Sequence, residues 1–582
     1  MTTSTLAILT IAFPWVGAML IWLVGDKYNK VITTLAVAFA ALAGVSALAL
    51  IPTAGDQAVF SYSFGAPYGI FTFVPDGLGV MLASIATVIG CLAVIFSIDY
   101  MKGEDQLARY YAFILFFIGG MVGLVLTGNM VCMFLFWEIT ALCSYALISF
   151  NNDDPKAVAG GINALIITQV GGVGLLIGAL IIYTYTGSFE INAFLKNPSL
   201  VPAGMLSLTA FGFLAAAAAK SAQFPFQTWL PDAMEAPTPI SALIHAATMV
   251  NAGVYLLARF YPAFESVPGW RTSVLAVGVI TALITSVMGL VANDLKRVLA
   301  YSTVSQLGYM VFAIGAGSVF ASQFHLFSHA IFKALLFLAA GAVIHSVGTR
   351  DMRKMGGLGK QMPLVRSVFI IGSLALAGIP ILNGFWSKEL ILEAGIAHAP
   401  VWTAFMFIGA GLTALYTLRM VWLVFYGEPR EHLHGHDAGP AMKVALIPLA
   451  IGAIISWLAA GWMGELFHAT LPYHEIHTAG VGEILLEVVS APATYAALAV
   501  IALGGIAWWQ RQKLSGIQKA IGFLSSAAEN SFGFEAINRA IVNTVEKLAE
   551  GIRPLQTGIL SWNIAGILGA IILILIAVVW GA

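Results

Sequence analysis

Charged side chains are scarce in this sequence of 582 residues. Asp, Glu, Lys and Arg make up 9% of it, whereas apolar residues make up 59%. A soluble domain carries about 25% charged residues, so this composition excludes that class. The apolar residues form long runs, many of which reach about 18 residues, enough to cross a bilayer as a helix. The runs do not alternate between polar and apolar residues, which excludes a transmembrane β-barrel. We therefore predict an all-α polytopic membrane protein.

Cysteine is also scarce. The three cysteines, Cys91, Cys132 and Cys143, each lie in an apolar run and form no CxxC or similar motif. This chain therefore lacks the cysteine set that an iron–sulfur cluster needs. The sequence also lacks a phosphate loop, a dinucleotide-binding glycine pattern and a catalytic triad motif. We expect no cofactor or metal in this chain, and we expect any electron transfer to take place in other subunits.

The apolar length of each run predicts about sixteen membrane spans. The run Leu6–Val24 lacks the basic leader of a signal peptide, so we interpret it as the first span. The predicted spans cover residues 5–24, 31–51, 77–98, 110–126, 130–150, 158–185, 205–231, 238–262, 272–292, 297–316, 322–346, 364–395, 400–426, 442–463, 490–510 and 558–581.

The distribution of basic residues predicts which way the chain crosses the membrane. With the N-terminus outside, 20 of the 27 Lys and Arg residues fall in inner loops or in the segment 511–557. The outer side holds Lys196, Arg259 and Arg271. An excess of this size fits the positive-inside rule, so both termini are predicted outside. The four basic residues left at membrane depth are Lys220, Lys333, Lys388 and Arg419.

The segment 511–557 is too polar to be a span. Ile537, Ile541, Val545 and Leu548 recur at helical spacing. This pattern predicts an amphipathic helix that lies along the membrane or along a partner subunit. We expect Gly533 to interrupt it, and Arg553-Pro554 to end it before the last span.

Two charges of opposite sign lie at similar depth in the fifth and seventh spans. Glu138 is in FLFWEITALCSY and Lys220 is in AAAAAKSAQFPF. A charge at mid-membrane costs at least about 2.5–3.5 kcal/mol, so it needs a partner or a function. The two residues are predicted to form an ion pair. A static bridge is the alternative, although such bridges stabilise proteins poorly.

Three titratable residues share one face of the eleventh span. His325, His329 and Lys333 in HLFSHAIFKALLFL follow one another at intervals of four residues. They therefore lie about one helical turn apart, which is a plausible proton relay. The alternative is three polar residues that only pack the helix.

Two spans contain helix breakers close to a lysine. Gly378, Pro380 and Gly384 should interrupt the twelfth span, just before Lys388 and Glu389. Pro225 should interrupt the seventh, five residues after Lys220. Broken helices at membrane depth occur where the backbone lines a cavity, and paired breaks indicate an internal repeat.

Isolated histidines complete the candidate set. His245 in the eighth span is placed to connect Lys220 with Lys333, although packing explains it equally well. His432, His434 and His436 on an inner loop fit either a metal site or a solvated loop.

Two long motifs in this sequence resemble a known family. KSAQFPFQTWLPDAMEAPTPISALIHAATMVNAGVYLLAR and LKRVLAYSTVSQLGYM are similar to the large antiporter-like subunits of respiratory complex I, membrane-bound hydrogenases and Mrp cation/proton antiporters. The resemblance runs from about Asp76 to Phe425. The C-terminal part resembles complex I subunit L, which has a long lateral helix followed by a last span.

The resemblance implies a fold and a division of the chain. It implies two inverted five-helix repeats with broken helices, a lateral amphipathic helix and a final span. The implied segments are N-terminal spans 1–109, first repeat 110–262, second repeat 263–426, additional spans 427–510, lateral helix 511–557 and last span 558–582.

The resemblance also implies residue roles. Glu138 and Lys220 match the charge pair of the first repeat, and Lys333 matches the central lysine. His325 and His329 lie beside that lysine, His245 matches the connecting histidine, and Lys388 matches the basic group at the distal exit, followed by Glu389. The expected pathway is thus Glu138, Lys220, His245, His325, His329, Lys333, Lys388 and Glu389.

One stretch departs from the subunit L pattern. Where subunit L usually has a sequence like RVGD, this chain has Gln169-Val170-Gly171-Gly172, closer to hydrogenase and Mrp proteins. We therefore expect an ion-pumping, non-redox subunit of a complex I-like or hydrogenase-like oxidoreductase. The alternative is a subunit of an Mrp-type Na⁺/H⁺ antiporter.

Expected partners are other membrane subunits, including further antiporter-like ones, distant redox subunits and lipid, but no nucleic acid. We expect a bacterial or archaeal cytoplasmic membrane.

Overall fold

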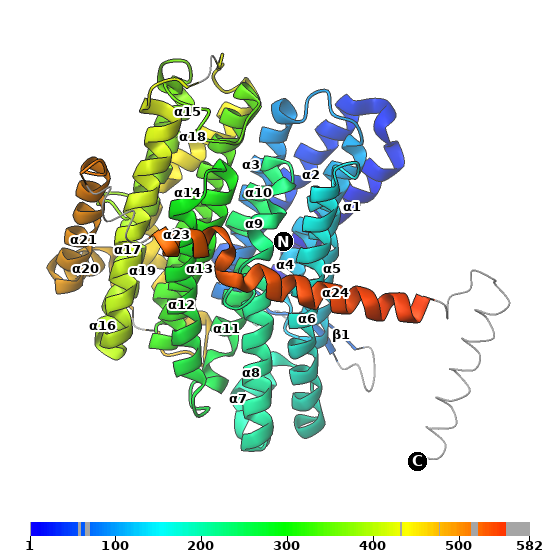
Figure 1. Ribbon diagram of the computed structural model, residues 1–582. Helices are drawn as coiled ribbons and strands as arrows, with labels where there is room; N and C mark the ends of the chain where they lie inside the picture. Colours follow the sequence, from blue (N-terminus) through cyan, green and yellow to red (C-terminus); the bar gives the residue numbers. More distant parts are fainter. Residues whose placement is uncertain are drawn as a thin grey trace. The chain divides into compact units, whose positions relative to one another are not determined.

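The computed structural model describes residues 2–55, 60–63, 70–430, 433–476, 478–513 and 522–553. The described chain is helical except for an antiparallel pair of short strands, β1 (Phe60–Ser63) and β2 (Ile70–Phe73). It divides into two compact units, Met1–Phe532 and Gly533–Ala582. The all-α fold predicted from the apolar runs is confirmed (Figure 1).

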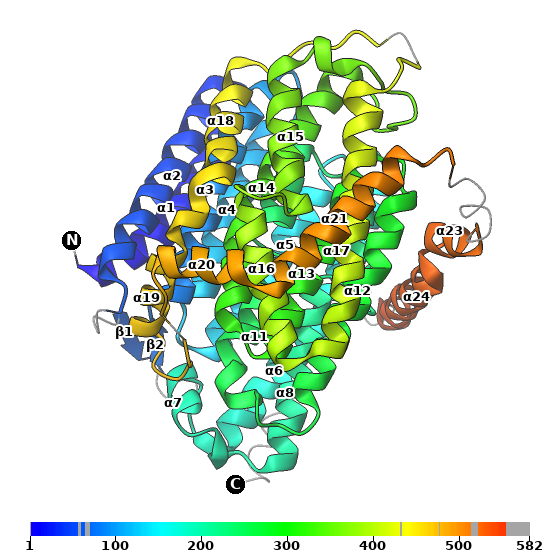
Figure 2. The same ribbon diagram turned by 90° about the vertical axis from the view of Figure 1, so that its left-hand side faces the viewer.

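The long helices of the first unit run side by side (Figures 1 and 2). Those in the N-terminal half are α1 (Thr3–Val24), α2 (Asn29–Leu50), α3 (Gly77–Tyr100), α4 (Leu107–Leu126), α5 (Met130–Ile148), α6 (Pro155–Thr186), α8 (Ala203–Lys220) and α11 (Asn251–Phe264). Those that follow are α12 (Trp270–Val291), α13 (Leu295–Ala316), α14 (Val319–Val347), α15 (Pro363–Ala377), α16 (Asn383–His398), α17 (Pro400–Val421), α18 (Pro440–Ile455) and α19 (Ala460–Thr470). The helices α20 (Val481–Ser490) and α21 (Pro492–Trp509) cross the others obliquely (Figure 2). The short α7 (Ile191–Lys196) lies at the opposite end of this unit from the start of α15.

Fourteen helical segments in the described part of the chain are long and apolar enough to span a membrane. The predicted twelfth span is instead two shorter helices, α15 and α16, and the predicted last span, 558–581, lies outside the described residues. The count of sixteen is therefore not confirmed, although each other predicted span coincides with a helical segment.

Both predicted helix breaks are present. α8 ends at Lys220, and eight residues separate it from the short α9 (Trp229–Asp232), with Ala222 at φ 50°. α15 ends at Ala377, followed by Gly378 at φ 84°. A left-handed conformation of this kind favours glycine and stops a helix. Each break leaves helix-end carbonyl groups without their usual helical partners.

A third irregularity was not predicted. Ala242–Ala247 forms a π-helix, η5, between the single turn α10 (Thr238–Ser241) and α11. Such π-helical turns often occur at functional sites, and this one carries His245.

Glycines let two helix pairs approach closely. A methyl group added at Gly174 of α6 would lie 2.3 Å from the carbonyl oxygen of Gly212 in α8. One added at Gly278 of α12 would lie 2.7 Å from the Gly308 carbonyl oxygen in α13. Small residues at such contacts are the usual means by which membrane helices pack tightly.

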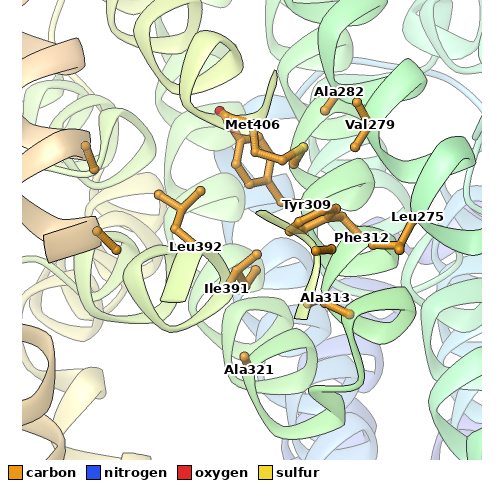
Figure 3. Close-up of a cluster of buried hydrophobic side chains, with 14 of the residues drawn as sticks. Leu275, Val279, Ala282, Tyr309, Phe312, Ala313, Ala321, Ile391, Leu392 and Met406 are labelled. Carbon is orange, nitrogen blue, oxygen red and sulfur yellow. The ribbon is translucent and has the colours of Figure 1, made fainter. Parts of the chain in front are cut away.

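A buried apolar cluster holds α12, α13, α16 and α17 together (Figure 3). Tyr309 lies in this cluster with Phe312, Ile391, Leu392 and Met406 around it. The Tyr309 hydroxyl donates to the Met406 carbonyl at 2.6 Å, so its polar end is satisfied inside the apolar core.

Two helices follow α21 in the described part of the chain, and a glycine separates them. Gly533 has φ 80° and separates α23 (Gly522–Glu529) from α24 (Phe534–Ile552), as expected. Ala528 of α23 packs against Met288 of α12 within the first unit. In the second unit, the four apolar residues predicted to share a helix, at positions 537, 541, 545 and 548, all lie in α24.

A buried ion pair joins the start of α3 to α11. Asp76 caps α3 by accepting from the Gly79 amide at 3.0 Å, and its carboxylate also accepts from the Arg259 guanidinium. Arg259 donates in addition to the Tyr255 hydroxyl at 3.0 Å. Only 4% of Arg259 is exposed, because Asp76 gives the guanidinium a partner inside the protein. Its predicted place on the outer side of the membrane stays a prediction.

We expect Arg259→Met to destabilise the protein by about 3–5 kcal/mol, because it leaves the Asp76 carboxylate buried without its cation. Thermal aggregation of the detergent-solubilised protein measures the change. The double variant Asp76→Asn with Arg259→Met should recover most of the loss, since asparagine still caps α3. Equal instability of the single and double variants would contradict this account.

Candidate functional site

Lys220 is the last residue of α8 and is fully buried. Its ammonium nitrogen donates to the Trp137 carbonyl of α5 at 2.8 Å and lies 4.9 Å from the centre of the Trp137 ring. The carbonyl dipole and the face of the indole both attract a cation. The break after α8 therefore ends the helix where its lysine meets the neighbouring helix.

Glu138 follows Trp137 but forms no ion pair with Lys220 within 4.0 Å in the described structure. The predicted direct ion pair is therefore absent, because Lys220 binds the backbone of α5 instead. The two charges still interact electrostatically, and Gln169 of α6 interacts with the Glu138 carboxylate. Gly172 leaves room for this carboxylate, since a methyl group there would lie 2.9 Å from Glu138 Oε1.

Lys333 lies in the middle of α14 and is also fully buried. Its ammonium nitrogen donates to the Leu299 carbonyl at 3.1 Å and to the Ser302 hydroxyl, both on α13. The Lys333 and Lys388 ammonium groups interact electrostatically. A proton held at one of them is therefore sensed at the other.

The two histidines of α14 have different surroundings. His325 Nδ1 lies 2.9 Å from the Ser387 hydroxyl, and its Nε2 lies 3.1 Å from Gln306 Oε1. The ring of His329 lies 6.4 Å from that of His325 and faces the Ala246 backbone. Neither ring nitrogen of His329 has a hydrogen-bond partner among the described residues.

Lys388 lies six residues into α16, after the second break. Its ammonium nitrogen donates to the Leu376 carbonyl at 2.9 Å and lies 5.6 Å from the ring centre of Tyr309. Leu376 is in the last turn of α15, where carbonyl groups lack helical partners. A cation at this end of a helix is also favoured by the helix dipole.

Glu389 and Glu393 lead from Lys388 to a cavity of about 760 Å³. Glu389 is 1% exposed, and both of its carboxylate oxygens lack a hydrogen bond to any described residue. One helical turn further on, Glu393 interacts with Glu389 electrostatically and lines the cavity. The cavity is also lined by Glu265, Arg271, His398, His474 and Glu487.

His245 lies on the π-helix η5, close to Trp229 and one residue before Ala246. The Trp229 indole donates to the Ala219 carbonyl, next to Lys220, at 2.9 Å, and its ring lies 6.2 Å from His245. The neighbouring Ala246 faces His329. A role for His245 in connecting Lys220 with Lys333 remains a prediction.

Sequence reasoning missed Lys296. It was counted with the inner loops, but it lies in the first turn of α13, is 2% exposed and donates to the Ala236 carbonyl at 2.5 Å. It also interacts electrostatically with His245. The local sequence LKRV does not show that Lys296 is buried while the adjacent Arg297 is partly exposed. Lys296 is covered because η4 (Ala233–Glu235), a segment distant in the sequence, packs against α13.

Buried polar atoms without a protein partner gather on the elements that carry these residues. Within the described ranges they include Glu138 Oε1, both side-chain ends of Gln227, both ring nitrogens of His245 and of His329, and Glu389. Gln223, Asn251, Gln306, Gln323 and Asn383 each leave at least one such atom. Native interiors normally satisfy buried polar groups, often through ordered water, so these atoms offer binding sites for water molecules.

The histidine-rich inner loop contains no metal site in the described part of the chain. No group of three His, Cys, Asp or Glu side chains there could hold a metal ion, and His432 lies outside the described residues. The His436 amide donates to the Ser346 hydroxyl at 2.6 Å, and Asp437 caps the start of α15. These contacts show the loop fastening helix ends.

Comparison with known proteins identifies the family. A family model described as "NADH:quinone oxidoreductase/Mrp antiporter, TM" matches residues 127–413, and one described as "NADH-Ubiquinone oxidoreductase (complex I), chain 5 N-terminus" matches residues 70–111. NADH-quinone oxidoreductase subunit L of Pseudomonas aeruginosa is 37% identical over 541 residues, which cover 88% of this chain and 85% of that protein. The chain belongs to this family of antiporter-like membrane subunits. The resemblance drawn from the two motifs is confirmed.

Other members of the antiporter-like family are similar over most of the chain. F(420)H(2) dehydrogenase subunit L of Methanosarcina mazei is 38% identical over 74% of this chain and 71% of that protein. NAD(P)H-quinone oxidoreductase chain 5 of a Picosynechococcus strain is 41% identical over 68% of this chain, but the match spans only 65% of that protein. The solved Mrp complex from Dietzia sp. DQ12-45-1b has a chain with a TM-score of 0.82 and 26% identity, over all of this chain and 63% of that one. The chain is thus an integral membrane protein with the antiporter-like fold.

The second helix break depends on Gly384. A methyl group at this position would lie 2.0 Å from the Ala375 carbonyl oxygen of α15. We expect Gly384→Ala to push α15 and α16 apart and to destabilise the protein by about 1–3 kcal/mol. Gly204→Ala in α8 is the control, because a methyl group there meets nothing within 4 Å. Thermal aggregation in detergent compares the two variants, and equal stability would contradict the close contact.

Proposed function

We propose that this chain translocates protons as an antiporter-like subunit of a redox-driven, complex I-like membrane complex. The observation that supports the proposal is a set of titratable residues inside the helix bundle, all of them buried except the half-buried Glu138. In our proposal they act in series, from Glu138 through Lys220, His245, His329 and His325 to Lys388 and Glu389, with Lys333 beside the histidines. The partnerless polar atoms along this series support its hydration, because buried polar groups normally bind ordered water where protein offers no partner.

In this proposal each lysine alternates between two partners. In the structure Lys220 binds the Trp137 carbonyl, and its electrostatic interaction with Glu138 would strengthen if the side chain turned toward that carboxylate. Such a movement changes the potential at Lys333. Since like charges repel strongly in a medium of low dielectric constant, a proton on Lys333 would then pass toward Lys388 or leave it. No cofactor in this chain is needed for these steps.

The outlet of the series is proposed to be the cavity beside α16. Glu389 and Glu393 lie one turn apart, and Glu393 reaches the cavity wall. Under the predicted topology this cavity faces outside, with both termini on the same side of a bacterial or archaeal cytoplasmic membrane. The acidic lining would draw protons from Glu389 toward that side.

The face of α5 that carries Glu138 is proposed to contact another membrane subunit. Glu138 is only half-buried, and Leu135 and Leu142, which flank it on the same helical face, are each 55% exposed. A carboxylate on a lipid-facing surface at mid-membrane would be costly, so a neighbouring polar surface must cover it. A second antiporter-like subunit would supply such a surface, and it would place Glu138 where the neighbour's charge can act on it.

We expect Lys333→Ala to reduce proton pumping at least about 10²-fold, because the variant removes the central proton carrier. Assembly should stay intact, because the partners left behind are neutral hydrogen-bonding groups. Acidification or alkalinisation of reconstituted proteoliposomes measures pumping, and native gel electrophoresis measures assembly. Lys156→Ala, at an exposed lysine at the start of α6, is the matched control. Normal pumping by the Lys333→Ala complex would refute the relay.

The second candidate function is a subunit of an Mrp-type Na⁺/H⁺ antiporter without a redox partner. The structural likeness to the Mrp complex and the Gln169–Gly172 stretch favour it. The lysine ammonium groups argue for protons as the transported ion, because they occupy the carbonyl groups of Trp137, Leu299 and Leu376 that a sodium ion would need as ligands.

Purification of the native complex distinguishes the two candidates. Identification of its soluble subunits by mass spectrometry should find quinone-reducing, F420-oxidising or hydrogenase subunits if the first proposal is correct. A complex that contains only small membrane subunits, together with sodium-dependent proton movement in proteoliposomes, would support the Mrp-type alternative.

A further inference from the structure

His325 is held by hydrogen bonds at both of its ring nitrogens. Gln306 of α13 presents Oε1 to Nε2 at 3.1 Å, so that nitrogen carries a hydrogen and donates. Ser387 of α16 lies 2.9 Å from Nδ1. His325, on α14, is therefore held by one hydrogen bond to α13 and one to α16. The ring nitrogens of His329, one turn away, have no hydrogen-bond partner among the described residues.

The Ser387 hydroxyl has two acceptors within reach but a single hydrogen. Its oxygen lies 2.9 Å from His325 Nδ1 and 3.0 Å from the Asn383 carbonyl. When His325 is neutral, with its hydrogen on Nε2, Nδ1 can only accept, so Ser387 must turn its hydrogen to the ring and leave Asn383. When His325 is protonated, Nδ1–H donates to the Ser387 oxygen, and the Ser387 hydrogen is free to bind the Asn383 carbonyl.

The charge on His325 thus selects the hydrogen-bond pattern at the start of α16. Asn383 and Ser387 span the first turn of α16, and Lys388 is the next residue. Asn383 also ties this turn to its surroundings, because its amide donates to the Ser328 carbonyl at 3.1 Å and to the Ser456 hydroxyl at 3.0 Å. The groups that face His325 electrostatically are His329 on its own helix and Lys388 on α16.

We propose that Ser387 and Gln306 are positioning residues that report the protonation state of His325 to the α16 turn carrying Lys388. The inference rests on the proposed proton translocation and adds to it the residues that join the two halves of the route. Neither residue exchanges a proton with its partner in this role. Gln306 fixes which nitrogen of His325 faces α16, and Ser387 changes the direction of one hydrogen bond.

The pH profile of pumping tests the inference. Ser387→Ala removes the hydrogen bond at Nδ1 from both states of the ring. The bond accepted from the protonated ring is charge-assisted and is the stronger of the two, so its loss should move the midpoint of the profile by about one unit to lower pH. Gln306→Glu places a carboxylate against Nε2–H and favours the protonated ring, which should move the midpoint by about one unit to higher pH. Opposite shifts are not expected if the two residues have only a structural role.

Two further variants serve as controls. Ser387→Thr keeps the hydroxyl and should restore the profile of the unmodified complex. Ser373→Ala removes another buried hydroxyl, one that has no partner in the described structure and lies on α15 away from His325, and it should leave the profile unchanged. All variants are compared at equal amounts of assembled complex, so a failure to fold is recorded separately.

The outcomes separate this inference from the proposed function. Loss of pumping in Lys333→Ala, together with unshifted profiles in Ser387→Ala and Gln306→Glu, would overturn the inference and leave the proposed function in place. Normal pumping in Lys333→Ala would overturn the proposed function itself. Shifts in the same direction for Ser387→Ala and Gln306→Glu would also overturn the inference, because they would reflect a general disturbance around His325.

Discussion

A cation inside an apolar helix bundle is tolerated only where oxygen atoms replace its water. The four buried lysines of the described residues all bind a backbone carbonyl on a neighbouring element: Trp137 for Lys220, Ala236 for Lys296, Leu299 for Lys333 and Leu376 for Lys388. A carbonyl satisfies the ammonium group without neutralising it. Lys333 therefore remains electrostatically coupled to Lys388, Lys220 to Glu138 and Lys388 to Glu389.

The helix interruptions follow from the same constraint. A continuous helix uses its carbonyl groups internally, whereas a helix end leaves several without helical partners. α15 ends in mid-bundle, and Lys388 binds its last turn. Arg271 and Arg419 do the same at the ends of α13 and α12, nearer the ends of the bundle. The cations thus stabilise the helix ends while the helix ends make it possible to bury the cations.

Two pairs of opposite charges in this chain differ in their geometry. Arg259 and Asp76 form a direct pair that also caps α3, so this pair fastens α3 to α11. Glu138 and Lys220 are held apart by the Trp137 carbonyl and ring. A direct pair resists movement, because separating it exposes two unpaired charges. A separated pair can respond to a charge nearby, as a conducting route requires.

The sequence alone determined the membrane class, nearly all of the helical segments and both broken helices. It could do so because apolar length, proline and glycine act locally. A lysine in an apolar run is likewise visible without coordinates, which made Lys220, Lys333 and Lys388 candidates. The two long motifs then identified the antiporter-like family, which the comparisons confirm. Only the tertiary structure decided which partner each charge takes. Lys296 is buried because η4 packs over it, Lys220 meets a carbonyl and not Glu138, and Gln306 and Ser387 converge on His325 from two other helices. Such contacts depend on how helices distant in the sequence are rotated against one another, and the local pattern of residues carries no record of that rotation.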